Sequence, residues 1–276
     1  MLLRYSRYTD SAQLESHLPN VKRFVMARNE LLDNITHKDL KVNPIYSSDL
    51  GDNVGSTITF VTEFSDVQKE YPILFRKDPP SNQYQAVVLL GLQQDENLFL
   101  QVQEQSLQQN NPGWQAHYVP AAIARGPFMI GFQARQENGQ EVVSPMVHVD
   151  MEHPKISTTQ GVNVFLAQGG NSPYLEHISH LLNVVRDGVE LNKRMFAVFE
   201  KYELIEPVAI NVDLENSHKL KLKGFYTVNI ERLTALDGDA LKELSKTGFL
   251  QAAYFAISSL SNIKLLIAMK NAKNRA

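Results

Sequence analysis

The chain contains no cysteine among its 276 residues, and this absence excludes several kinds of site together. Without a thiol there can be no disulfide, thiolate zinc site, iron–sulfur cluster or cysteine nucleophile. Excess charge of one sign is also lacking, because 27 Lys and Arg side chains nearly balance 30 Asp and Glu side chains, for a net charge of −3. No global positive field attracts nucleic acid, so we expect no nucleic-acid partner.

Long apolar runs are missing as well. The first residues lack the apolar core, about 7–15 residues long, of a signal peptide. No window approaches the run of roughly 18 apolar residues that spans a bilayer. The longest apolar stretch, near the C-terminus, is interrupted by Ser258, Ser259, Ser261, Asn262 and Lys264. We therefore expect a cytoplasmic chain without a transmembrane segment.

The common catalytic motifs are absent too. The sequence has no Gly-x-Ser-x-Gly elbow, no His-Glu-x-x-His helix, no P-loop lysine and no three-glycine Rossmann fingerprint. This absence does not exclude catalysis, but it favours a protein that is not an enzyme and that needs no cofactor.

Strand patterns gather in the first half of the chain, about 36–155, and helix patterns in the second, about 156–276. No linker divides the halves, so we expect one domain over residues 1–276. We predict an α+β fold: a mainly antiparallel sheet in the N-terminal half, on which a long helix, a late hairpin and C-terminal helices pack. The predicted hairpins pair Pro72–Arg76 with Tyr84–Leu90, Pro127–Arg135 with Glu141–Val149 through a turn at Asn138-Gly139, and Pro207–Leu214 with Lys219–Asn229.

The long helix is predicted to begin at Pro173, with Ser172 as its cap. Its apolar stripe consists of Leu175, Ile178, Leu181, Leu182, Val185, Val189, Met195, Phe196 and Phe199. Further predicted helices cover Leu14–Leu32, Gly238–Leu244 and Gly248–Asn271, and further strands Lys38–Ile45, Ser56–Val61 and Glu96–Val102.

Several segments resemble the bacterial SapC family in order and spacing. In the first half these are Glu70–Asp78, Ala86–Leu92, Glu96–Phe99, Gly113–Ala121 and Gly126–Phe128. In the second half they are Gly224–Val228, Leu233, Leu236, Leu250–Tyr254 and Ser258–Leu260. The resemblance extends from about residue 37 to 265, most of the chain.

The resemblance implies a role without a mechanism. The family name comes from association with a bacterial surface layer. Its members occur beside flavin-dependent tryptophan halogenases, cupin-like hydroxylases and TonB-dependent receptors. This implies an accessory to peptide modification or envelope uptake, with a protein or peptide partner. It carries no set of catalytic residues.

Aromatic and cationic residues in the SapC-like segments are the candidate ligand site. They are Trp114, Tyr118, Arg76, Arg125 and Tyr71. Trp, Tyr and Arg dominate binding hot spots, so this group could hold a peptide or an aromatic ligand. The other interpretation makes Trp114, the sole tryptophan, a core anchor whose indole N–H finds one partner.

Acidic residues and histidines form a second set of candidates. His148 and Asp150 would point to one face of a strand, and with a distant histidine they could build a non-haem iron site. The other interpretation, which we favour, is a strand end with a solvated polar face. Glu63 and Glu70, seven residues apart, form either an acid pair or a solvated helix face.

Three functions are consistent with these patterns. The leading hypothesis is a non-enzymatic binding or accessory protein. The alternatives are a metal-dependent enzyme that uses His148 and Asp150, and a surface-layer component.

Overall fold

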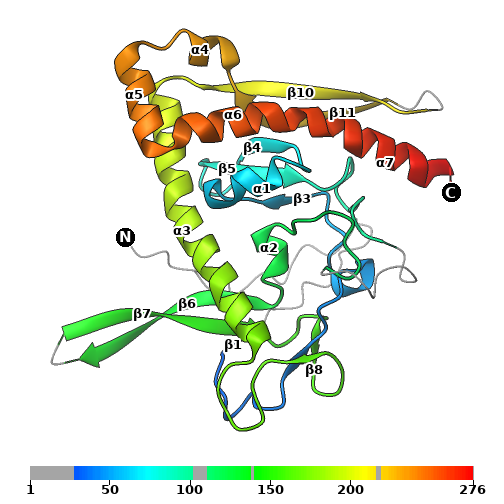
Figure 1. The fold of residues 1–276 in the computed structure, drawn as a ribbon, viewed down its shortest axis with the longest axis vertical. Helices are drawn as coiled ribbons and strands as arrows, with labels where there is room; N and C mark the ends of the chain where they lie inside the picture. The colour runs from blue at the N-terminus through cyan, green and yellow to red at the C-terminus, as the bar shows by residue number, and fades with distance from the viewer. Residues whose placement is uncertain (1–27, 102–110, 138–139, 216–218, 276) are drawn as a thin grey trace, which may run out of the picture.

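A computed structural model describes residues 28–101, 111–137, 140–215 and 219–275. Antiparallel sheets combine with a long helix and C-terminal helices, so the predicted α+β class is confirmed. Figure 1 shows a larger sheet with helices at one end of the molecule and the smaller sheets at the other. The helix α3 (Pro173–Lys201) extends from one end to the other.

The larger sheet has five strands in the order β10-β11-β4-β5-β3, and every neighbouring pair is antiparallel. Two predicted hairpins form its centre and one side. The strands are β3 (Ser56–Ile58), β4 (Ile73–Lys77), β5 (Tyr84–Leu89), β10 (Ile205–Asp213) and β11 (Lys219–Val228). The apolar run of β5 is buried, as expected of an inner strand.

The two smaller sheets have three strands each, in the orders β1-β7-β6 and β8-β2-β9. The third predicted hairpin forms β6 and β7, whose connecting turn lies outside the described residues. The strands are β1 (Asn29–Leu31), β2 (Lys41–Val42), β6 (Phe128–Glu137), β7 (Gln140–Asp150), β8 (Ile156–Ser157) and β9 (Val162–Asn163).

The helices include several short ones. The Oγ of Ser172 accepts a hydrogen bond from the N–H of Leu175, so α3 begins as predicted. The others are η1 (Ser48–Leu50), η2 (Val61–Glu63), α1 (Phe64–Val67), α2 (Ala121–Ala124), α4 (Ile230–Thr234), α5 (Gly238–Thr247), α6 (Phe249–Ser259), η5 (Leu260–Asn262) and α7 (Ile263–Arg275).

Some predicted elements were wrong. The helix predicted over Leu14–Leu32 lies mostly outside the described residues, but its last part, Asn29–Leu31, is the strand β1. The strand predicted over Lys38–Ile45 is limited to Lys41–Val42. Glu96–Leu100, from the strand predicted over Glu96–Val102, forms only an isolated bridge, between Leu100 and Trp114. These segments contain apolar residues, but the strands that pair with them are short. Tertiary contacts therefore decide their backbone conformation.

Two hydrophobic cores occupy the two ends of the fold, and α3 contributes to both. Its last turns bring Met195, Phe196 and Phe199 into the larger core, where Phe196 meets Phe75 of β4 edge-on at 5.1 Å between ring centroids. Its first turns bring Leu175 and other apolar side chains into the smaller core beside the β6–β7 hairpin. The helix therefore holds the two ends together.

The C-terminal helices qualify one sequence expectation. Phe249–Arg275 is, within the described ranges, one helical stretch long and apolar enough to cross a membrane. The expectation that no window could do so was therefore too strict. Length and composition alone are weak evidence, because a core helix passes the same test. One side of α6 is buried and the helix packs on β4 and β11, which places it on the larger sheet (Figure 1).

A glycine in the middle of α3 allows a close contact between elements. A Cβ built on Gly188 would lie 2.4 Å from Cβ of Phe60 and 2.9 Å from Oγ1 of Thr62. No larger residue fits here unless η2 moves. Glycine weakens a helix interior by about 1 kcal/mol relative to alanine. The close contact with η2 explains why a glycine is nevertheless found at position 188.

We expect Gly188→Ala to lower the free energy of unfolding by about 1–3 kcal/mol, because overpacking outweighs the better helix propensity of alanine. Urea denaturation measures this. Gly238→Ala is the matched control, since a Cβ there meets nothing within 4 Å. Equal stabilisation by both substitutions would contradict the packing explanation.

Candidate functional site

Three of the predicted ligand-binding residues meet inside the larger core. The indole Nε1 of Trp114 donates a hydrogen bond to the hydroxyl of Tyr71 at 2.8 Å. The Tyr71 hydroxyl donates in turn to the backbone carbonyl of Tyr118 at 2.5 Å. Trp114 and Tyr71 are fully buried, and both rings pack against Phe99. Neither ring presents a surface to a ligand, so their role in the structure is to hold the segment around Tyr118.

The chain of hydrogen bonds ends on a buried carboxylate. The Tyr118 hydroxyl donates to Oε2 of Glu63 at 2.7 Å, and the N–H of Ala121 donates to the same atom at 2.9 Å. The other oxygen, Oε1, accepts from the Thr59 hydroxyl at 2.8 Å and from the N–H of Phe60 at 3.3 Å. The interpretation of Glu63 as part of a solvated helix face was therefore wrong. Burial raises the pKa of Glu63, and the four donors oppose that rise.

The second glutamate holds the same loop from the other side. The carboxylate of Glu70 accepts hydrogen bonds from the backbone N–H groups of His117 and Tyr118 at 3.0 and 3.1 Å. It also pairs with Nδ1 of His117 at 3.0 Å. Glu63 and Glu70 form no acid pair; together they fix the loop that leads into α2.

We expect Glu63→Gln to lower the free energy of unfolding by about 1–3 kcal/mol, because in either orientation the new amide NH₂ would face a backbone N–H, that of Ala121 or that of Phe60. Chemical denaturation measures the loss. Glu190→Gln, at an exposed pair on α3, is the control and should change stability by less than about 1 kcal/mol. A loss no larger than the control's would show that the four contacts do not stabilise the fold.

The two arginines among the candidates lie apart. Arg76 is on β4 opposite Gln85 of β5. Within the described ranges, no hydrogen bond or ion pair joins Arg76 to the other four candidates. Arg125 follows α2, where its Nη1 donates to the backbone carbonyl of Phe128 at 2.5 Å. The five predicted residues therefore do not converge on one site.

Arg125 borders a large apolar groove, which we call the α3–β6 groove. It has a volume of about 850 Å³, against 150–190 Å³ for three other cavities. Its apolar walls come from β3, β6 and α3. The apolar lining residues are Ile58, Met129, Ile130, Phe132, Leu182, Val185, Val189 and Leu191, and the charged ones are Arg125, Arg186, Asp187, Glu190 and Lys193.

Three apolar side chains in this groove are unusually exposed. The exposed fractions are 68% for Phe132, 40% for Val189 and 37% for Ile58. A sequence reading missed the groove because Val189 belongs to the apolar stripe of α3, and such a stripe predicts burial. The length of the apolar stripe on α3 could have revealed the groove, because the stripe is longer than the part of the helix that the two cores bury.

Arg125 is the cation of the groove that, among the described residues, forms no ion pair with a carboxylate. Arg186 pairs with Asp187 at 2.9 Å, and Lys193 pairs with Glu190 at 2.7 Å. In the part of the chain that the structure describes, no Asp or Glu side chain forms an ion pair with Arg125. Burial lowers the pKa of its guanidinium, but arginine remains charged in proteins.

The sequence comparison decides the family. A profile of the SapC family matches residues 32–266, most of the chain. The chain belongs to the SapC family. No curated protein and no solved structure matches it. The SapC match includes all the residues that line the α3–β6 groove.

The segments that carried the SapC resemblance lie mainly in the core. Glu70–Asp78 contains β4, Ala86–Leu92 includes the last four residues of β5, and Gly113–Ala121 contains Trp114 and Tyr118. Gly113 has a φ of +87°, and a Cβ there would lie 2.0 Å from the carbonyl oxygen of Tyr46. These SapC positions build the scaffold rather than a reactive site.

The predicted metal ligands His148 and Asp150 lie on β7, two residues apart. The imidazole of His148 packs over Gly131 of β6, where an added Cβ would be 2.3 Å from Cε1. Across the described residues, no group of three or more His, Asp or Glu side chains could hold a metal ion. The metal hypothesis therefore has no third ligand to support it and stays a prediction.

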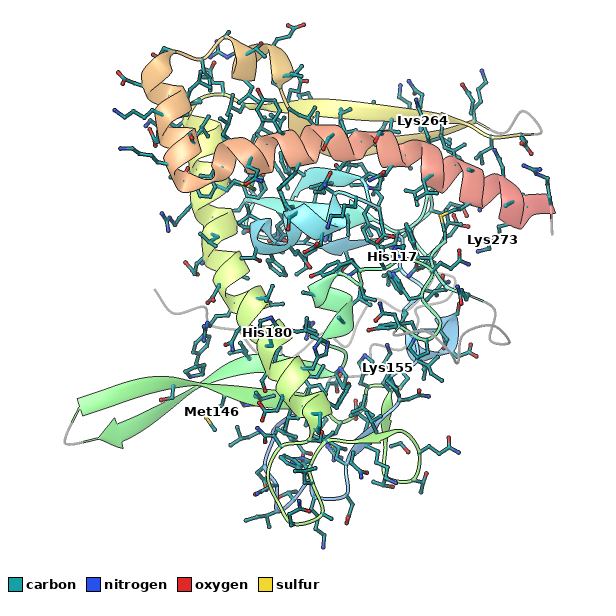
Figure 2. All side chains as sticks on the ribbon, in the orientation of Figure 1. His117, Met146, Lys155, His180, Lys264 and Lys273 are labelled. Carbon is teal, nitrogen blue, oxygen red and sulfur yellow. The ribbon has the colours of Figure 1, made fainter. Side chains whose placement is uncertain are left out.

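A buried ion pair joins the segment after η1 to the segment between β7 and β8. Nζ of Lys155 lies 3.0 Å from Oδ1 of Asp52 and 4.2 Å from the ring centroid of Tyr46. Figure 2 shows Lys155 among the loops between α2 and the small sheets. Burial lowers the pKa of Lys155, and Asp52 opposes this. Burial likewise raises the pKa of Asp52.

We expect Lys155→Met to lower the free energy of unfolding by about 3–5 kcal/mol, because it leaves the Asp52 carboxylate buried without its partner. Adding Asp52→Asn should recover part of the loss. Lys193→Met, which removes an exposed partner, should cost less than about 1 kcal/mol. Urea titrations compare the variants, and a double variant no more stable than Lys155→Met would refute this explanation.

Proposed function

We propose that this SapC protein is a non-enzymatic binding protein that holds an apolar segment of a protein or peptide partner in the α3–β6 groove. The observation that carries the proposal is the convergence of Phe132, Val189 and Ile58, all partly exposed, on one groove of about 850 Å³. A large apolar concavity with a few polar groups is the usual form of a ligand site.

The energetics favour an apolar occupant. Burying apolar surface contributes about 25 cal/mol per Å². A partner that covers the three exposed side chains would therefore gain binding free energy. Exposed apolar patches rimmed by charge are typical of interaction sites. The charged rim here is Arg186, Asp187, Glu190 and Lys193 along α3.

The family membership supports an accessory role. SapC-like proteins are expected beside peptide- or tryptophan-modifying enzymes and envelope receptors, and a groove for an apolar segment suits a protein that presents a peptide to such partners. We propose that it acts in the cytoplasm. No observation in the structure favours the metal enzyme or the surface-layer component over this role.

A random nonapeptide pool with free C-termini tests the proposal. We expect the immobilised full-length chain to enrich apolar peptides, as read by mass spectrometry. Val189→Glu should reduce this enrichment about tenfold or more, because it places a charge in the apolar groove. A tenfold change corresponds to about 1.4 kcal/mol of binding free energy.

Ile230→Glu is the matched control. Ile230 is 47% exposed on α4, a degree of exposure similar to that of Val189, but it does not line the groove. This variant should enrich the same peptides as the wild type. Absence of any enrichment, or equal enrichment by wild type and Val189→Glu, would refute binding in the groove.

A further inference from the structure

The groove lies along the open edge of a sheet. The strand β6 is the last strand of the order β1-β7-β6, so one of its sides has no neighbouring strand among the described residues. Met129 and Ile130 are consecutive in β6 and so point to opposite faces of the sheet, yet both line the groove. The groove therefore runs along the edge of β6 rather than over one face.

The hydrogen-bonding groups that face this edge can be assigned. The N–H of Asp150 donates to the carbonyl of Pro127, and Phe128 pairs with Val149 in register. Because successive residues of an antiparallel strand alternate in direction, the N–H and C=O groups of Phe128, Ile130 and Phe132 point away from β7. The N–H of Leu32, the residue after β1, donates to the carbonyl of Val147, the partner of Ile130, which agrees with this alternation.

Arg125 occupies only the first position of that edge. Its Nη1 donates to the carbonyl of Phe128, and its own carbonyl accepts from the N–H of Phe128. The outward groups of Ile130 and Phe132 have no hydrogen-bond partner in the ranges that the structure describes. Such an edge is a template for one more strand.

The position of Arg125 determines the direction of an added strand. A segment antiparallel to β6 would have its C-terminal end beside Phe128, at the beginning of β6. There the guanidinium has N–H groups to donate beyond the one used on Phe128, and it forms no ion pair with a side chain of the described residues. A terminal carboxylate matches it in charge and in geometry. Asp52, Asp150 and His153 line an adjoining cavity with Arg125, and neither carboxylate forms an ion pair with it.

We propose that the α3–β6 groove binds the C-terminal segment of its partner as an added antiparallel strand on β6, with the terminal carboxylate on Arg125. This rests on the proposed binding function and specifies its ligand. The backbone of the segment pairs with Ile130 and Phe132, and its apolar side chains contact the groove walls of α3 and β3. Main-chain hydrogen bonds supply affinity, and the groove and the carboxylate supply specificity.

Two nonapeptide pools, identical except for a free carboxylate or an amide at the C-terminus, test the carboxylate. The full-length chain should enrich peptides from the carboxylate pool about tenfold more than from the amide pool, since a charge-assisted hydrogen bond is lost on amidation. Equal enrichment from both pools would overturn the proposal while leaving the binding function intact. Enrichment from neither pool would refute the binding function itself.

Variants of the chain locate the effect. Arg125→Gln should abolish the preference for the carboxylate pool, and Arg125→Lys should restore part of it. Arg232→Gln is the matched control, because Arg232 is an exposed arginine that pairs with Glu203 and does not line the groove, so this variant should keep the preference of the wild type. Circular dichroism verifies that each variant is folded. An unchanged preference in folded Arg125→Gln would overturn the assignment.

N-methylation of the tightest-binding peptide tests strand addition. Methyl groups on alternate amides, those that face β6, should each weaken binding about tenfold or more, whereas methyl groups on the intervening amides should have little effect. Fluorescence polarisation measures the affinities and requires no change to the protein. A loss without alternation, or no loss at any amide, would overturn the added-strand geometry.

Discussion

One helix serving two cores is the constraint on which the rest of the structure depends. The first turns of α3 are buried in the smaller core and its last turns in the larger one. Between them the apolar stripe continues, and Gly188 brings η2 into contact with one side of the helix. The next residue, Val189, is partly exposed and lines the groove. The groove lies along the middle of α3, between the parts of the helix that the two cores bury.

The buried carboxylates explain how the edge of that groove is held in place. Glu63 accepts from Tyr118 and from Ala121, the first residue of α2. The helix α2 ends at Ala124, and Arg125, which caps it, is separated by two residues from the start of β6. Each of these segments is short, with little intrinsic preference for its conformation. A desolvated carboxylate with four donors positions them more strictly than propensity does.

The predictions from sequence succeeded where local chemistry decides the backbone. The three hairpin pairings and the Ser172 cap of α3 were confirmed, because alternating apolar residues and a side-chain cap act over a few residues. They failed at Lys38–Ile45 and Glu96–Leu100, where pairing partners come from distant segments. Glu63 was misjudged for the same reason: two of its four donors are more than 50 residues away.

The sequence by itself determined the α+β class, the start of α3, the absence of thiol chemistry and membership of the SapC family. Only the tertiary structure decided that Trp114 and Tyr71 are core residues, whereas Arg125, from the same candidate group, borders a groove. The physical reason is that composition and periodicity state which side chains avoid water, but not which apolar surfaces find a partner. On α3 the same stripe is buried at both ends and open in the middle, and the edge of β6 lies beside that opening.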